Sequence, residues 1–273
     1  MVNDNYSTLL VARYGNIVDI ALHRPEVRNA FNETLISELT ETVTHASEDR
    51  CRALVLRGSG AAFCAGADLD WMARAAGYTY EANLEDARRL QRMFAAIAHF
   101  SGCTIAVVTG AAIGGGAGLA AVCDTTIADE SAVFALSEVR LGLVPAVIAP
   151  YVIEKIGAGA ARSLFVTGER FDALTALRIG LIQQITTGEQ QRTQVLAATL
   201  TKILEAGPHA IATAKRLTCK IAGKSPDDVA EITAACIAGL RVGAEGREGI
   251  LAFLEKRQPS FVEALSETYG TGN

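Results

Sequence analysis

The sequence has little of what metal sites, nucleic-acid binding and membrane insertion require. It has only four histidines, and its six cysteines form no C-x-x-C pair and stand near no histidine cluster, so no metal site is predicted. We expect the cysteines to be buried, reduced thiols. The formal net charge of -5 and the pI near 5.5 give no overall attraction for nucleic acid or an anionic membrane, so any basic site must be local.

Leader peptides, long apolar runs and several familiar enzyme motifs are also missing. The stretch from Met1 to Gly15 contains the acidic Asp4 and lacks the apolar or arginine-rich pattern of a signal or transit peptide. No apolar run reaches the length of a membrane span. The motifs G-x-x-x-x-G-K-[ST], G-x-S-x-G and H-E-x-x-H are absent, and the glycines lack the full dinucleotide-binding spacing. We therefore expect a cytoplasmic protein with no membrane contact.

What is present indicates a globular α/β protein. Half of the 273 residues are hydrophobic and 20% are charged, which is typical of a folded enzyme-sized chain. A strand, a loop of small residues and a helix follow one another twice, with the strands at Ala53–Leu56 and Ile105–Val108. An earlier hairpin is predicted from Leu9–Ala12 and Ile17–Leu22 around Gly15. Alternating strands and helices predict a layered core with parallel strands.

The β signal disappears from about Gln190, and helices dominate the rest of the chain. No repeat and no flexible linker separates this part from the core, so we expect it to pack on the core or on a neighbouring subunit. The expected helices are Val195–Glu205, Pro208–Ala222, Asp227–Leu240 and Arg247–Leu254.

The most informative segment is the glycine-rich run from Gly110 to Leu119, which sets Gly114, Gly115 and Gly116 before an apolar helical segment. Unpaired amides at a helix start favour negative charge, and glycine lets a ligand approach the main chain closely. One interpretation is a packing turn between a strand and a helix. The other is an oxyanion hole that stabilises charge on a carbonyl oxygen.

A second loop, from Phe63 to Asp68, follows the strand Ala53–Leu56 as the glycine run follows Ile105–Val108. The carboxyl ends of parallel strands meet at one edge of a sheet, so both loops could converge on one ligand. The candidate for proton transfer is Glu138, which has apolar neighbours that would raise its pKa towards neutrality. The competing interpretation is a salt bridge to Arg140 or a solvated position.

With both loops and Glu138, the chain resembles the crotonase (enoyl-CoA hydratase/isomerase) superfamily over nearly its full length. This resemblance implies a spiral of ββα units in residues 1–195 and a helical trimerisation region in residues 196–273, commonly assembled as a trimer or a dimer of trimers. The matching stretches, in chain order, are His23–Glu26 with Arg28–Ala30, Phe63–Leu69, Gly110–Asp124, Ser137–Pro145 and Glu248–Arg257.

The resemblance also implies the ligand, an acyl-CoA thioester, with no cofactor beyond the CoA of the substrate. The amides of Ala67 and Gly115 would form the oxyanion hole beside the catalytic Glu138. Gly114, Gly118, Leu143 and Trp71 would line the substrate pocket. Phe253 and Lys256 would reach CoA from a neighbouring subunit. The other residues that would contact CoA are Arg28, Ala30, Ala65, Asp68 and Leu69.

Two stretches depart from the pattern of typical hydratases. The earlier of their two catalytic glutamates falls on Gly118, and Pro145–Pro150 replaces a glycine-rich stretch. Both departures look like the bacterial subgroup of methylglutaconyl-CoA hydratases. The resemblance therefore implies a lyase that hydrates a branched α,β-unsaturated acyl-CoA, with 3-methylglutaconyl-CoA as the expected substrate. Its second carboxylate could meet Arg74, Arg88 or Arg89 in the segment after Asp68. The competing interpretation places Arg88 and Arg89 on a solvated helix face. The alternatives are an enoyl-CoA isomerase, an acyl-CoA decarboxylase, or a non-catalytic acyl-CoA-binding subunit.

Overall fold

The computed structural model describes residues 2–3, 6–266 and 269. Its central feature is a seven-stranded sheet in which the middle strands run parallel, which confirms the predicted α/β class. Across the sheet, the strand order is β1 (Val2–Asn3), β2 (Leu9–Tyr14), β3 (Ile17–Leu22), β4 (Ala53–Gly58), β5 (Cys103–Val108), β7 (Thr125–Asp129) and β10 (Gln184–Thr186).

The predicted hairpin is present, because β2 and β3 pair antiparallel with Leu9 opposite Leu22. Gly15 closes the turn at φ +60°, a left-handed conformation that suits glycine. A small second sheet pairs β6 (Ala111–Ile113) with β8 (Val133–Ala135) and β8 with β9 (Arg170–Asp172). Three-residue strands carry too little periodicity for β6 and β9 to be expected.

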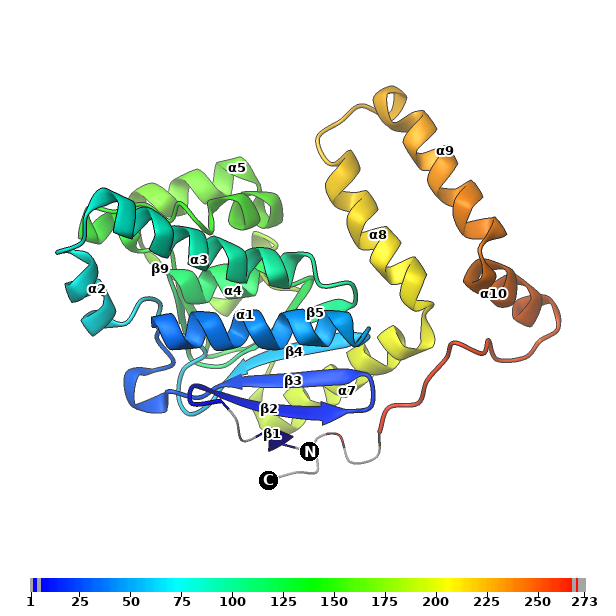
Figure 1. Cartoon of the computed structure of the whole chain (residues 1–273), viewed down its shortest axis with the longest axis horizontal. Helices are drawn as coiled ribbons and strands as arrows, with labels where there is room; N and C mark the ends of the chain where they lie inside the picture. The colour runs from blue at the N-terminus through cyan, green and yellow to red at the C-terminus, as the bar shows by residue number, and fades with distance from the viewer. Residues whose placement is uncertain (1, 4–5, 267–268, 270–273) are drawn as a thin grey trace.

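Helices cover both faces of the large sheet. On one face, α1 (Glu33–Glu48) and α3 (Tyr80–Ala98) lie side by side (Figure 1) and bury Leu35, Leu39 and Phe94 in the main core. Asn32 caps α1, since its side chain accepts a hydrogen bond from the Leu35 amide. Further helices are α2 (Leu69–Ala75), α4 (Gly115–Val122), α5 (Ala149–Thr167) and α6 (Ala173–Arg178), with 3-10 turns at Pro25–Val27 and Glu138–Leu141.

The opposite face is covered by α7 (Gly188–Glu205), which begins seven residues before the expected helix and packs Leu196 and Leu200 against Val55 and Ile105. The expected boundary between residues 195 and 196 therefore lies inside α7. The three following helices form an arm that extends away from the sheet (Figure 1). They are α8 (Pro208–Ile221), α9 (Pro226–Val242) and α10 (Ala244–Leu254). No helix among the described residues has the length and apolar character needed to cross a membrane.

A buried arginine beside β4 connects the end of α7 with the chain that follows α10. Arg52, only 3% exposed, donates hydrogen bonds to the Ile203 and Ala206 carbonyls at the end of α7, and to the Phe261 carbonyl in the returning tail. Its guanidinium also lies 3.3 Å from a carboxylate oxygen of Glu263.

Replacing Arg52 with Met would remove these hydrogen bonds to the three carbonyls. We expect the free energy of unfolding to fall by about 1 to 3 kcal/mol, measured by urea denaturation. Arg13→Met is the matched control, because the Arg13–Asp49 ion pair is about half exposed and should contribute roughly 0 to 1 kcal/mol. Equal losses in the two variants would contradict the anchoring role of Arg52.

Candidate active site

The two predicted loops meet beside the small sheet. Cys64 and Ala112 form a parallel bridge, in which the Cys64 amide donates to the Ala111 carbonyl at 3.0 Å and the Ile113 amide donates to the Cys64 carbonyl at 2.9 Å. A methyl group on Gly66 would stand 2.9 Å from the Ile113 carbonyl oxygen and 3.9 Å from the Gly115 nitrogen. The glycines thus permit a closeness of the two backbones that side chains would prevent.

Two backbone donors are left without acceptors at this meeting point. The amide nitrogens of Ala67 and Gly115 donate to no other group within the described part of the chain. Gly115 is the first residue of α4, so its amide lies at the positive end of the helix dipole. Gly114 caps the helix at φ +53°, and its own amide donates to the Ala135 carbonyl at 2.8 Å. Such a pair of free donors suits a developing oxyanion.

Glu138 lies against the same helix start. Its Oε1 atom is 3.0 Å from where a Cβ on Gly114 would stand, and its buried Oε2 atom has no hydrogen-bond partner among the described residues. Burial raises the pKa of the Glu138 carboxyl, against a smaller opposing effect of its own backbone amide. A partly buried carboxylate with one unpaired oxygen, beside two free amides, can accept and return a proton.

The expected alternative, a Glu138–Arg140 salt bridge, is not formed. The Arg140 Nε atom instead donates to the Gly168 carbonyl at 2.9 Å, at the end of α5. Glu138 begins the 3-10 turn Glu138–Leu141, and its carbonyl accepts from the Leu143 amide at 3.1 Å. This turn directs the carboxylate towards α4 while the guanidinium is held elsewhere.

Comparison with known proteins identifies the site's family. Residues 12–264 match the enoyl-CoA hydratase/isomerase family. The chain belongs to this family. It is similar to enoyl-CoA hydratase ACTT6 of Alternaria alternata, with 32% identity over 89% of this chain and 80% of that protein. The curated relatives include proteins named enoyl-CoA hydratases, which are lyases, so the predicted class of enzyme is confirmed at the family level.

Solved structures agree with this family assignment. The chain is similar to a crystal structure of an enoyl-CoA hydratase from Shewanella pealeana, with TM-score 0.90 and 38% identity over 94% of this chain and 96% of the other. It is also similar to Pseudomonas aeruginosa AtuE, with TM-score 0.89 and 37% identity over 94% and 100%. The expected crotonase fold is therefore confirmed.

The residues that the family pattern assigns to the substrate pocket occupy different surroundings. Gly118 is buried one turn along α4 from Gly114, whose carbonyl accepts from the Gly118 amide at 3.0 Å. Leu143 follows the Glu138 turn and is 57% exposed. Trp71 lies on α2, partly packed on the core, and its indole donates to Asp86 at 3.0 Å.

The expected CoA contacts in the core surround the Ala67 loop. The Arg28 carbonyl accepts from the Ala65 amide at 2.9 Å, while the Ala30 carbonyl accepts from the Arg24 side chain at 2.6 Å. Asp68 is largely satisfied within the chain, since it caps α2 and lies 2.9 Å from Arg24. Burial alone would raise the pKa of the Asp68 carboxyl. The hydrogen bonds from the first amides of α2 and the charge of Arg24 have a larger combined effect, so the pKa is lowered. These groups shape the Ala67 loop.

Leu69, which follows this loop, and Phe253 in the arm are 78% and 82% exposed. Lys256 follows α10 at φ +55°. In Figure 1, α10 lies on the opposite side of the chain from α2, so Phe253 and Lys256 do not join this chain's own Ala67 loop. Their expected contribution from a neighbouring subunit stays a prediction.

Two residues beside the site were not predicted from the sequence. Phe31 packs its ring where a Cβ on Gly115 would stand, and Ile148 does the same at Gly118. The sequence could not identify them, because an apolar side chain next to a loop carries no signal of which glycine it will cover. No group of three or more metal-ligating side chains occurs among the residues that the structure describes.

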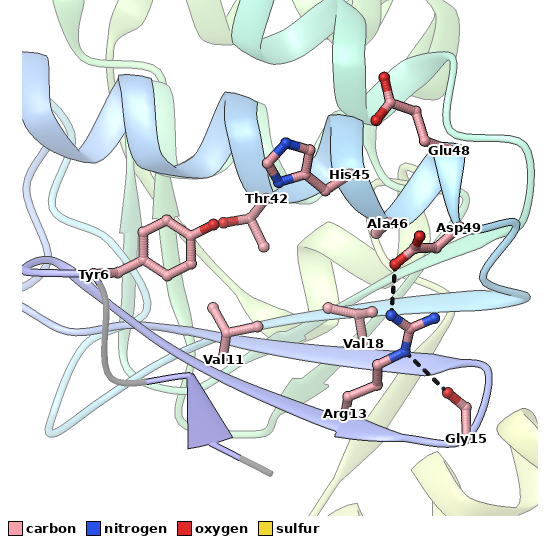
Figure 2. Close-up of a pocket in the computed structure, with 10 residues that line it drawn as sticks. All are labelled: Tyr6, Val11, Arg13, Gly15, Val18, Thr42, His45, Ala46, Glu48 and Asp49. Atoms are coloured by element: carbon pink, nitrogen blue, oxygen red, sulfur yellow. Dashed lines mark hydrogen bonds and ion pairs between the residues drawn. The ribbon is translucent and has the colours of Figure 1, made fainter.

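A separate surface hollow of about 540 Å³ lies between β2, β3 and α1 (Figure 2). It is lined by residues that include Tyr6 and His45, and its rim carries Arg13 paired with Asp49 at 2.6 Å. Gly15 and Val18 place it at the amino end of β3, whereas the Ala67 and Gly115 loops follow the carboxyl ends of β4 and β5. The hollow is therefore not part of the candidate active site.

Proposed function

We propose that this chain hydrates a branched α,β-unsaturated acyl-CoA, with 3-methylglutaconyl-CoA as the leading candidate. The observation that carries the proposal is the buried Oε2 atom of Glu138, which has no hydrogen-bond partner among the described residues, at the helix start where the amides of Ala67 and Gly115 are free. A thioester carbonyl polarised by two amides gives an electrophilic β-carbon and a stabilised enolate. The membership of the family supports the same class of substrate.

In this mechanism the thioester oxygen accepts hydrogen bonds from Ala67 and Gly115. Glu138 takes a proton from a water molecule while the oxygen of that water bonds to the β-carbon, and negative charge moves onto the thioester oxygen. Glu138 then returns a proton to the α-carbon, so the product differs from the substrate by one water. The raised pKa of Glu138 suits a group that must both accept and release a proton.

The proposal extends to the partners and surroundings of the reaction. The CoA of the substrate is its only cofactor, held by the loops around Arg28 and Ala65, and the enzyme is cytoplasmic. A homotrimer or dimer of trimers would bring Phe253 and Lys256 of the arm to a neighbouring subunit's CoA. The exposed apolar side chains of α10, such as Leu251 and Leu254, suit burial in such an interface.

The second carboxylate of 3-methylglutaconyl-CoA needs a cation, and the three arginines expected to supply one all have carboxylate neighbours. Arg74 binds Glu33 through two contacts of 2.8 and 2.9 Å, and the guanidiniums of Arg88 and Arg89 lie 3.8 to 4.0 Å from Glu85. All three arginine side chains are at least half exposed. A dicarboxylate substrate would have to compete with these pairs, so equal affinity for charged and uncharged enoyl-CoAs would retire the arginine role.

Isomerisation of the double bond is the second candidate, and the packing at Gly118 favours it. Ile148 and Phe94 occupy the side of α4 where a second carboxylate would be needed for two-glutamate hydration. A single carboxylate can move a proton from one carbon to another, which is all that isomerisation requires.

Product mass separates these reactions. We expect 3-methylglutaconyl-CoA incubated with the enzyme to yield a product heavier by one water, detected by mass spectrometry. An unchanged mass with a shifted double bond would replace hydration with isomerisation, and loss of carbon dioxide would indicate decarboxylation. Tight CoA binding without turnover of any substrate in a panel would support a non-catalytic subunit.

A further inference from the structure

The helix α4, which begins with the free amide of Gly115, has no charged side chain of its own. Its eight residues are glycine, alanine, leucine and valine, and those from Gly116 to Val122 are buried. The last carbonyls of a helix have no partner within it and form the negative pole of its dipole. Charges near a buried helix are weakly screened, so the groups that meet the carboxyl end of α4 matter for the whole helix.

A lysine from α5 reaches that carboxyl end. The Lys155 Nζ atom donates to the Cys123 carbonyl at 2.7 Å and to the Asp124 carbonyl at 2.9 Å, in the two residues that follow α4. Its hydrogen-bond partners in the described part of the chain are these main-chain oxygens and not a carboxylate. Burial lowers the pKa of Lys155, and nearby acidic groups only partly offset this effect. A cation is thus held inside the protein by the end of α4.

The second lysine at this end is already paired with a carboxylate. Lys215 of α8 lies 2.8 Å from Oδ2 of Asp124, which also accepts from the Thr104 amide at 2.8 Å and from the Thr104 hydroxyl at 3.0 Å. The charges of this pair cancel, and the nearby Glu154 is exposed to water, which screens its charge. Lys155 is therefore the cation that opposes the negative pole of α4.

We propose that Lys155 is a positioning residue for the oxyanion hole. It holds the carboxyl end of α4 and opposes the negative pole there, so that the Gly115 amide at the other end polarises the thioester oxygen more strongly. The inference rests on the proposed function, because it takes that oxygen to bind the Gly115 amide. A lysine that served only the fold would change stability without changing the polarisation of the bound thioester.

The stretching frequency of the bound thioester carbonyl tests this role, because polarisation lowers that frequency. We would measure it by infrared difference spectroscopy with butanoyl-CoA that carries a heavy carbon isotope at the carbonyl. We expect the wild-type protein to lower the frequency relative to free ligand. Lys155→Met keeps the length of the side chain without its charge, so it should reduce this lowering and reduce kcat on enoyl-CoAs by about tenfold. Lys155→Arg should restore both.

Lys202→Met is the matched control, since Lys202 is exposed on α7, which covers the opposite face of the sheet. It should leave the frequency and kcat unchanged. If Lys155→Met does not fold, Lys155→Gln replaces it, because glutamine keeps a hydrogen-bond donor without the charge. A wild-type frequency in the uncharged Lys155 variants would overturn the inference and leave the proposed function intact. A wild-type protein that does not lower the frequency of the bound ligand would overturn both.

Discussion

Glu138→Gln is expected to lower kcat by about 10²- to 10⁴-fold while leaving affinity for a saturated acyl-CoA near the wild-type value. The amide keeps the size of the carboxyl group but cannot take a proton from water. Because the amides of Ala67 and Gly115 are untouched, the thioester should still bind. Steady-state kinetics on the enoyl-CoA panel, with calorimetric binding, would measure both quantities.

The same substitution should stabilise the protein, and by more as the pH rises. Burial raises the pKa of Glu138 in the folded protein above its ordinary value. Between the ordinary pKa and the raised one, the unfolded chain loses its proton more readily than the folded protein, so the free energy of unfolding falls as the pH increases. Glutamine does not ionise. The Tm of the variant should therefore exceed that of the wild-type protein by a margin that grows as the pH rises above 4.5, the ordinary pKa of a glutamate.

Glu169→Gln is the control for both measurements, since Glu169 lies just after α5 and is exposed, so this substitution removes a carboxylate that is not buried. It should change neither kcat nor the pH dependence of Tm. Retention of wild-type turnover by Glu138→Gln would eliminate Glu138 as the proton carrier. A Tm below that of the wild-type protein at neutral pH would instead show that the carboxylate is a structural ion.

Gly116→Ala should damage both the fold and the oxyanion hole. A Cβ at Gly116 would overlap the backbone carbonyl oxygen of Cys64 and stand 2.9 Å from the Cys64 Cβ. The start of α4 would have to move away from the Ala67 loop, which separates the amides of Ala67 and Gly115. We expect a loss of about 1 to 3 kcal/mol in unfolding free energy and of about 10²- to 10³-fold in kcat/KM.

Gly159→Ala gives the matched comparison. Gly159 lies in α5, and nothing stands within 4 Å of a Cβ added there, so the added methyl group should stabilise the helix by up to about 1 kcal/mol without changing activity. Urea denaturation and kinetics on both variants would test the contrast. Equal stability and activity in the two alanine variants would mean that the close approach of α4 to Cys64 does not position the amides.

Local pattern predicted much of the fold. The hairpin β2–β3 and the strands β4 and β5 follow short apolar runs broken by turn residues, and these signals depend only on neighbours in sequence. The helix α5 was not predicted, because Pro150, Gly157 and Gly159 interrupt its pattern, and Gly157 adopts φ +76° within it. Its stability comes from packing against α4 rather than from propensity.

By itself, the sequence determined the α/β class and the two glycine-containing loops after β4 and β5, because strand ends and glycine runs are local features, and it offered Glu138 as the candidate for proton transfer. Only the tertiary structure decided which side chain covers which glycine: Glu138 over Gly114, Phe31 over Gly115 and Ile148 over Gly118. The physical reason is that contacts between segments far apart in sequence depend on how the elements pack, and no short stretch of the chain encodes that packing.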